Sequence, residues 1–345
     1  MDKIEIYLDG KDKLQRLANL FGVDIESYYT PAIVFDHDTT DQQIAKESGR
    51  LFYIFCENLA DRQYMSNIIQ FEDNRASIFK VFFGEDAKET SDWNPTLFLK
   101  RYPFRDCDKE ISERLFDKLI KTDEYKTRMD NYTKDYDIES EDYKRKTDFY
   151  RRQWLTYLCG AYQFACYLTK NDIPTFNKNF KCTGVTSYEK MPSMKDVYAP
   201  DIQDEQELAD YLLLIRKLWN TLKGVGVAVC CNVLKESGVT ALAKPDTHIM
   251  KIVDEMQKAG LLPPVAISKP KGKELYKEEK AVISMYRWAM DIKKQHPEEQ
   301  ISAFKLDRVI YLLCTNGYFY AQKDRDKIIS AKTLIAQIQQ NGKER

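Results

Sequence analysis

The stretch WLTYLCGAYQFACYL, from Trp154 to Leu168, limits the choice of fold more than any other part of the chain. It is apolar on nearly every side of a helix, which is the pattern of a helix buried all round. It carries Gln163 and is shorter than the ~20 residues that span a bilayer. We therefore predict a central buried helix in a chain of 345 residues, which is long enough for a sizeable core.

Composition narrows the class of protein. Apolar residues make up 43% of the chain and charged residues 31%, as in an ordinary folded protein. The formal net charge of −1 argues against binding nucleic acid through bulk charge, so any contact with DNA must be local. The first residues, MDKIEIYLDG, lack the pattern of a signal peptide. We expect a cytoplasmic protein with no membrane partner, associated with the nucleoid if it is bacterial.

Helical spacing of apolar residues recurs along most of the chain. Only the short stretch IEIYL, Ile4–Leu8, alternates in the manner of a strand, and no series of strands and helices predicts a parallel sheet. We expect a mainly α fold. The helical stretches include Gln42–Ile69, Asp204–Trp219, Leu275–Lys294, Ile301–Leu313 and Asp324–Gln339.

The segment Lys109–Asp148 is dense in charge and tyrosine and is the best candidate for a domain boundary. We expect a mostly helical N-terminal region, 1–140, to which the sequence assigns no role, and a second region, 141–345. The cluster KRK…RR, from Lys144 to Arg152, has two interpretations. It is either the solvated face of a helix or linker, or a patch that faces DNA.

The cysteines do not predict a metal site. Eight are scattered along the chain, no CxxC occurs, and the adjacent Cys230 and Cys231 lie in an apolar helical stretch where small buried thiols are common. The ligand spacing of a zinc ribbon or an iron–sulfur cluster is therefore missing. We therefore predict no structural metal cluster, and we identify no residue as a metal ligand.

Two glycines in the stretch LKGVG, from Leu222 to Gly226, precede an apolar helix. The N-terminus of a helix presents unpaired N–H groups and the positive end of the helix dipole, which suit an anion. Because Gly224 and Gly226 have no Cβ, backbone here could approach a phosphate directly, while Val225 and Leu222 anchor the flanking helices. A glycine turn between packed helices is also common without any ligand, so this motif alone is weak.

A second motif makes the first more specific. This second motif is the segment Pro245–Ile249, PDTHI. Its Asp246 lies 20 positions after Gly226 of the hairpin, since 246 − 226 = 20. Together the two motifs resemble the helix-hairpin-helix DNA glycosylase superfamily, the endonuclease-III-like base-excision enzymes, whose pattern is L-P-G-V-G-x-K-x-A followed by V-D-T-H. The clear resemblance covers about Ala209 to Asp254. It implies a helix-hairpin-helix DNA glycosylase-like fold, to which the N-terminal region is an addition.

The resemblance implies roles for individual residues. The hairpin, Leu222-Lys223-Gly224-Val225-Gly226, would hold the backbone of double-stranded DNA while a base is rotated out of the duplex. Asp246 would stabilise the positive charge that develops on the sugar as the glycosidic bond breaks. His248 would lie beside the acid as a DNA-binding neighbour. Asp246 is also a favoured N-cap, and one residue can fill both roles.

The chain departs from the family pattern in two ways. Ala228 stands where bifunctional relatives have the lysine that forms a Schiff base, since 226 + 2 = 228. The four-cysteine cluster motif is absent after the acid, which agrees with the cysteine spacing. The resemblance therefore implies a monofunctional DNA N-glycosylase with no cofactor, although the hairpin is compatible with a monovalent cation. Base recognition would fall to residues of the buried helix, Tyr157, Tyr162 and Gln163, for which core packing is the simpler role.

Two functions remain open at this point. One is an enzyme that hydrolyses a damaged or modified base from DNA, which the acid in register with the hairpin favours. The other is a non-catalytic helix-hairpin-helix module that binds DNA or a protein of unknown identity, which the missing lysine and the near-neutral charge favour.

Overall fold

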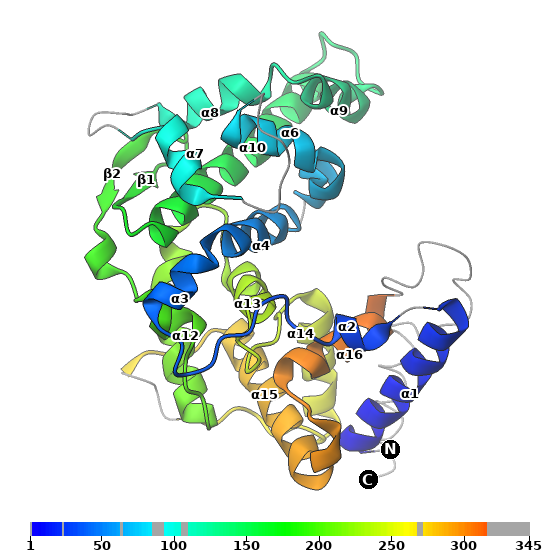
Figure 1. The fold of residues 1–345 in the computed structure, drawn as a ribbon. Coiled ribbons are helices and arrows are strands. Elements are labelled where there is room, and N and C mark those ends of the chain that lie inside the picture. The colour runs from blue at the N-terminus through cyan, green and yellow to red at the C-terminus, as the bar shows by residue number, and fades with distance from the viewer. Residues whose placement is uncertain are drawn as a thin grey trace. The chain divides into compact units, whose positions relative to one another are not determined.

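The computed structural model describes residues 2–22, 24–62, 65–84, 93–104, 110–267 and 272–315. Within these ranges the chain forms sixteen α-helices and one two-stranded antiparallel sheet, so the prediction of a mainly α fold is confirmed (Figure 1). No helix in these ranges is both long enough and apolar enough to cross a membrane. The expected helix Asp324–Gln339 lies outside the described residues.

The chain packs as two discontinuous units. The hairpin unit consists of Thr39–Asp196 and Lys217–Val229, and so contains the glycine hairpin. The acid unit consists of Met1–Asp38, Val197–Arg216 and the chain from Cys230 onwards, and contains Asp246. This division differs from the expected one near residue 140, because the helix that begins there packs against helices formed by residues 48–133.

The hairpin unit is built around helix α10, Glu141–Leu168. Its neighbours α4, α5, α7, α8, α9 and strand β1 all contact α10, which runs through the middle of this unit (Figure 1). The other elements of the unit are α3 (Asp41–Lys46), α4 (Ser48–Ala60), α5 (Ser66–Ile69), α6 (Phe71–Phe83), α7 (Pro95–Arg101), α8 (Ile111–Leu119), α9 (Asp123–Thr133), β1 (Ile173–Phe176), β2 (Cys182–Thr186) and the 3₁₀ turn η1 (Tyr188–Lys190).

Aromatic side chains form the core of this unit. Every residue from Trp154 to Leu168 except Thr156 is buried, as the sequence predicts for a central helix. The rings of Phe164 on α10 and Phe55 on α4 stack with centroids 3.9 Å apart. Trp93 packs edge-on against Phe52 and is 1% exposed. Such pairs stabilise the contact between helices beyond the burial of apolar area.

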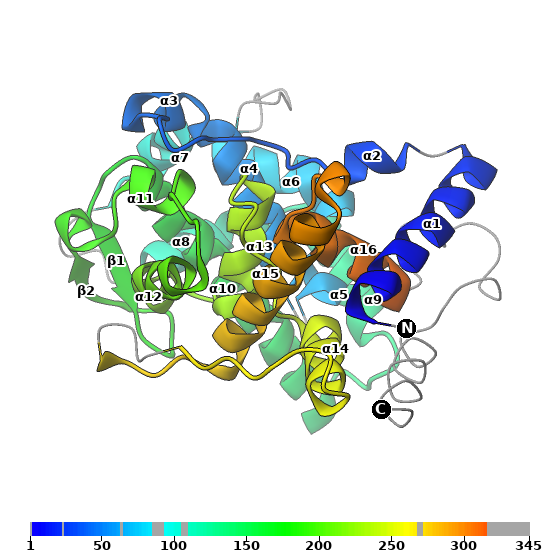
Figure 2. The same ribbon diagram turned by 90° about the horizontal axis from the view of Figure 1, so that it is seen from below.

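The acid unit contains three long helices in its C-terminal part. Helices α14 (Thr247–Lys258), α15 (Lys277–Gln295) and α16 (Ala303–Thr315) contact one another, and α1 (Lys3–Phe21) contacts α15 and α16 (Figure 2). The indole N–H of the buried Trp288 donates to the carbonyl of Lys3 at 2.8 Å, which ties α15 to α1. The unit also contains α2 (Ile25–Tyr28) and the 3₁₀ turn η3 (Pro297–Glu299).

Three helices have residues in both units. Helix α11 is Met194–Tyr198, α12 is Glu205–Thr221 and α13 is Val227–Glu236. The glycine hairpin joins α12 to α13, as the helix-hairpin-helix pattern predicts.

The expected strand at Ile4–Leu8 is wrong, because these residues lie in helix α1. Asp2 is the N-cap of this helix and accepts hydrogen bonds from the N–H groups of Ile4 and Glu5, and Glu5 bonds back to the N–H of Asp2. This capping box satisfies donors at the helix start, and it outweighs a short alternation of apolar residues. The strands occur instead at Ile173–Phe176 and Cys182–Thr186.

Candidate nucleic-acid interface and acid site

The hairpin turns at Gly224, whose φ of 80° lies in the left-handed region that favours glycine. A Cβ at this position would lie 2.7 Å from Cγ2 of Thr156 on α10, closer than real side chains approach. Gly160 on α10 has the matching role, since a Cβ there would lie 2.5 Å from the carbonyl oxygen of Lys223. Gly224 and Gly160 therefore allow the hairpin to pack closely on α10.

Gly226 differs from Gly224. It is exposed, and a Cβ at Gly226 would meet no atom within 4 Å. The backbone N–H groups of Gly226, Val227 and Ala228 find no acceptor in the described part of the chain, as at the start of most helices. Of the two hairpin glycines, only Gly226 leaves backbone open to a ligand, whereas Gly224 serves the packing.

Arg62 lies against the hairpin and was not anticipated from the sequence. Its Nη1 donates to the carbonyl oxygen of Gly224 at 3.1 Å. Its side chain is half-buried and forms no ion pair with any described carboxylate, and this burial lowers the pKa of the guanidinium. A cation in that position gains from a nearby anion. No local pattern marks Arg62, because its partner lies 162 residues further along the chain.

Lys223 and the other predicted hairpin residues hold the turn in place. The backbone N–H of Lys223 donates to Oε1 of Gln163 at 2.5 Å, and its ammonium donates to the carbonyl of Asn177 at 3.0 Å. The same ammonium lies 5.2 Å from the ring centre of Phe180. Leu222 is buried, and the N–H of Val225 donates to its carbonyl at 3.3 Å.

The three side chains suggested for base recognition all lie in the core of the hairpin unit. Tyr157 is fully buried, and the hydroxyl of Tyr162 donates to the carbonyl of Tyr102 at 2.8 Å. Gln163 is 1% exposed and donates to the carbonyl of Pro174 at 2.6 Å while it accepts from Lys223. All three side chains occupy positions of core packing, and Gln163 fixes the hairpin by joining it to strand β1.

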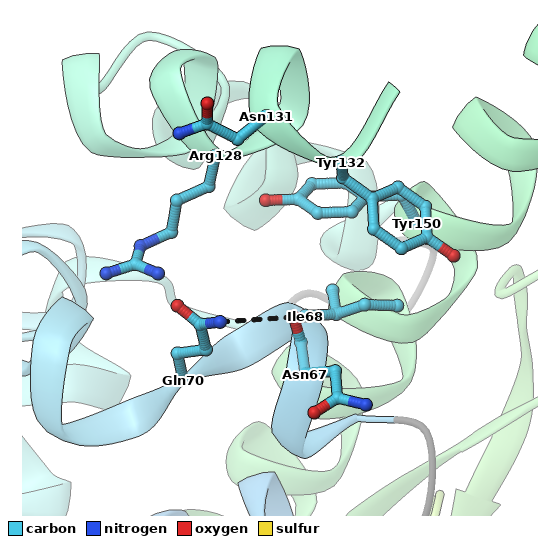
Figure 3. A pocket seen from close by; sticks show the side chains of 7 residues that line it. All are labelled: Asn67, Ile68, Gln70, Arg128, Asn131, Tyr132 and Tyr150. Carbon is cyan, nitrogen blue, oxygen red and sulfur yellow. Dashed lines mark hydrogen bonds between the residues drawn. The ribbon is translucent and has the colours of Figure 1, made fainter. Parts of the chain in front are cut away.

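The hairpin unit also contains a polar pocket of about 290 Å³ (Figure 3). Residues from α9 lie on one side and residues at α5 on the other, with two tyrosine rings between them (Figure 3). Gln70 has a φ of 43°, unusual for a residue other than glycine, and Arg128 is held by Asp73 and Asn74. The pocket offers amide donors and acceptors beside aromatic faces. It is lined by Asn67, Ile68, Gln70, Arg128, Asn131, Tyr132 and Tyr150.

Asp246, in the acid unit, is the N-cap of α14, as its sequence context predicts. Its Oδ1 accepts from the N–H groups of His248 at 3.0 Å and Ile249 at 3.1 Å. Its Oδ2 makes no hydrogen bond to the described residues, and the side chain is half-buried. One oxygen of Asp246 thus caps the helix, while the other remains available to a ligand or a water molecule.

The ring of His248 packs edge-on against Tyr311 of α16, with centroids 6.4 Å apart. His248 therefore has a packing contact within the acid unit beside its expected role near DNA. Lys244 and Lys251, which flank the acid in sequence, do not stand at the position of the family lysine, and neither does Lys223. That position is Ala228, near the start of α13.

Buried charges support the segment that carries Asp246. Asp307 of α16 accepts from the backbone N–H of Lys244 at 3.1 Å and pairs with the ammonium of Lys235 at 2.8 Å. Lys235 is 2% exposed and Asp307 3%. Burial raises the pKa of Asp307, and the charge of Asp246 also raises it, against the opposing effect of Lys235. Through these contacts, Lys235 and Asp307 fix the backbone of the segment that leads to Asp246. They are therefore candidates for positioning residues.

Glu236 adds two further ion pairs to this group of charges. Glu236 bonds to Lys235 at 2.9 Å and to Arg308, whose guanidinium lies 4.3 Å from the ring centre of Tyr28. The pairs join α13 to α16 across 72 residues of sequence. None of these four charged residues stands out in the sequence, because each member of a long-range pair resembles an ordinary surface charge when its partner is not known.

Metal ligands do not gather in the described ranges, where no three His, Cys, Asp or Glu side chains form a group that could hold an ion. Comparison with protein-family models, with curated proteins and with solved structures finds no match to the chain.

Proposed function

We propose that the protein is a monofunctional DNA N-glycosylase that hydrolyses a damaged or modified base from double-stranded DNA. The observation that carries the proposal is the hairpin. Its exposed Gly226, its three N–H groups that find no acceptor among the described residues, and the guanidinium of Arg62, which pairs with no described carboxylate, favour an anion. Phosphate is the anion that DNA presents along its whole length, and such contacts position a duplex without reading its sequence.

The chemistry is assigned to Asp246. Water adds to C1′ of the sugar, the bond from C1′ to the base nitrogen breaks, and the base leaves with a proton. Positive charge develops on the sugar during this step, and the unbonded Oδ2 of Asp246 would stabilise that charge or orient the water. Ala228 supplies no amine, so an intact abasic site would be the product.

The proposal is tested with labelled duplexes that each carry one damaged or modified base, and with the variant D246N. Asparagine caps a helix as well as aspartate does, so this change removes the charge and keeps the fold. We expect base release to fall by on the order of 100-fold or more, with DNA affinity equal or higher. The matched control is D254N, on the same helix, where Asp254 pairs with the exposed Lys277.

The product distinguishes the monofunctional mechanism. The abasic strand should break only on treatment with alkali or heat, and borohydride should trap no covalent adduct. A trapped adduct would show that a lysine amine attacks the sugar, and the monofunctional assignment would be wrong. Undiminished base release by D246N would remove Asp246 from the chemistry.

The second candidate function is a DNA-binding module without catalysis. It is favoured by the close packing of Gly224 on Thr156, since a hairpin that is needed for folding persists whether or not the acid acts. Duplex binding by the wild type with no base released from any member of the panel would support this module in place of the enzyme.

A further inference from the structure

A concave surface on the hairpin unit adjoins the hairpin and carries excess positive charge. It has a volume of about 550 Å³ and is formed by the N-terminal half of α10, by Glu113 of α8 and by the turn between β1 and β2. We call it the α10 surface. Its lining includes five cations, Lys144, Arg145, Arg151, Arg152 and Lys178, and three acids, Glu113, Glu141 and Asp148.

Most of these charges are neutralised within the protein. Arg151 makes two hydrogen bonds to the carboxylate of Glu113, at 2.9 and 2.8 Å. Lys144 pairs with Glu141 at 3.1 Å, and Arg145 pairs with Asp142 at 2.9 Å. A cation already paired in this way has less to gain from a ligand anion.

Arg152 and Lys178 are different. Both are exposed, and neither has a carboxylate partner among the described residues. Arg152 donates only to the backbone carbonyl of Asp148, at 3.3 Å. The turn that carries Lys178 is ordered by Asn177, whose Oδ1 accepts from the N–H groups of Asn179 and Lys181. Two cations are thus displayed on defined backbone without an internal counter-charge.

Contacts within the unit connect this surface to the hairpin along two paths. Thr156, which packs on Gly224, donates its hydroxyl to the carbonyl of Arg152 at 2.8 Å. Lys223 of the hairpin lies over the ring of Phe180, which lines the α10 surface. Thr156 is four positions after Arg152 on the helix, which is about 6 Å along the axis. Successive charges of one DNA strand are about 3.4 Å apart along the duplex, so the next phosphates are within reach.

We propose that Arg152 and Lys178 bind the DNA backbone next to the phosphate held by the hairpin, so that the duplex continues across the α10 surface. This inference rests on the proposed function, which it extends from one phosphate contact to a track. It also assigns the KRK…RR cluster: Arg152 belongs to the DNA contact, while Arg151 and Arg145 belong to internal ion pairs.

The test measures binding of a fluorescein-labelled duplex without a lesion, by anisotropy over a range of salt concentrations. Each phosphate contact contributes about 0.9 to the slope of log K against log salt. The double variant R152A/K178A should therefore bind more weakly and show a slope smaller by about two units. The matched control R151Q/E113Q removes a cation together with the acid that neutralises it, so the net charge of the same surface stays the same and the slope should be nearly unchanged.

A third variant tests the sign of the charge effect. Asp148 is exposed, lines the surface and has no cation within ion-pair distance in the described chain, so D148N should tighten binding of the duplex. Weaker binding by D148N would contradict the inference.

The outcomes separate this inference from the proposed function. If G226V weakens binding while R152A/K178A and R151Q/E113Q behave alike, the hairpin contact stands and the track is wrong. If the wild type binds no duplex at all, both fail. If R152A/K178A loses affinity for a single strand but not for the duplex, the surface belongs to single-stranded nucleic acid and the inference is overturned.

Discussion

At the residue scale, the segment that leads to Asp246 depends on charges that are buried together. Asp307 and Lys235 can both be buried because they form an ion pair with each other. Asp307 also accepts a hydrogen bond from the backbone N–H of Lys244. Removal of one partner from such a pair leaves an uncompensated buried charge, which costs about 3–5 kcal/mol. These residues act on the acid through the backbone that carries it.

Glu236 gives this group a dependence on pH. Burial alone would raise the pKa of its carboxyl, but Lys235 and Arg308 outweigh burial and hold the pKa below the ordinary 4.5. The unfolded chain therefore binds the proton more tightly, and the contribution of Glu236 is fully present above about pH 4.5 and is lost as the pH falls through the folded pKa. We expect E236Q to show a smaller fall in the free energy of unfolding between about pH 6 and about pH 3 than the wild type.

Urea unfolding at a series of pH values measures this difference. The control E189Q removes an exposed carboxyl of the hairpin unit and should follow the wild type. An equal fall in E236Q and the wild type would mean that Glu236 is not stabilised by its neighbours.

At the element scale, the hairpin and α10 fit together through two missing side chains. The two glycines of the hairpin are alike in sequence but not in surroundings, since Gly224 faces Thr156 and Gly226 faces open space. The third glycine, Gly160, leaves room on α10 for the carbonyl of Lys223 and for Leu59. Stability and ligand binding should therefore respond to different glycines.

We expect G160A to lower the free energy of unfolding by about 1–3 kcal/mol, the usual cost of overpacking a close contact. G226A should leave the stability nearly unchanged, because its new Cβ meets nothing and its φ is not in the left-handed region. G226A should nevertheless weaken binding of duplexes of every sequence, since phosphate contacts carry no sequence information. Urea unfolding and anisotropy on both variants check this, and equal stability of G160A and G226A would contradict the packing argument.

At the scale of the whole molecule, the two units are not separate lengths of chain. The chain passes between them four times, at residues 38/39, 196/197, 216/217 and 229/230. Helices α12 and α13 continue from one unit into the other, so unfolding of either unit would break hydrogen bonds in helices that the other shares. We infer that the units unfold together.

Two tryptophans allow this to be measured. Trp93 lies in the core of the hairpin unit and Trp288 in that of the acid unit, and each is at most 1% exposed. W93A and W288A should each destabilise by about 3–5 kcal/mol and lower the midpoint of the same single urea transition. Tryptophan fluorescence and far-UV circular dichroism should give coincident curves. Two transitions, with only one shifted by each variant, would show that the units unfold independently.

The amino-acid sequence by itself determined the helical class, the buried helix Trp154–Leu168 and the turn at Gly224, because each depends on residues close together in the chain. It also placed Asp246 at the start of a helix, since an N-cap is a local feature. The capping pair Asp2 and Glu5 is also a local signal, and it indicates the α-helix at Ile4–Leu8 against the short alternation of apolar residues.

Which of these residues are exposed depends on the tertiary structure. Gly224 and Gly226 have the same freedom as residues, yet only packing on Thr156 separates a structural glycine from an exposed one. Arg62 reaches the hairpin, and Lys235 reaches Asp307, across sequence separations that no local pattern records. Pairing likewise distinguishes Arg152 from Arg151, because whether a charge is available depends on what its neighbours in space have already neutralised.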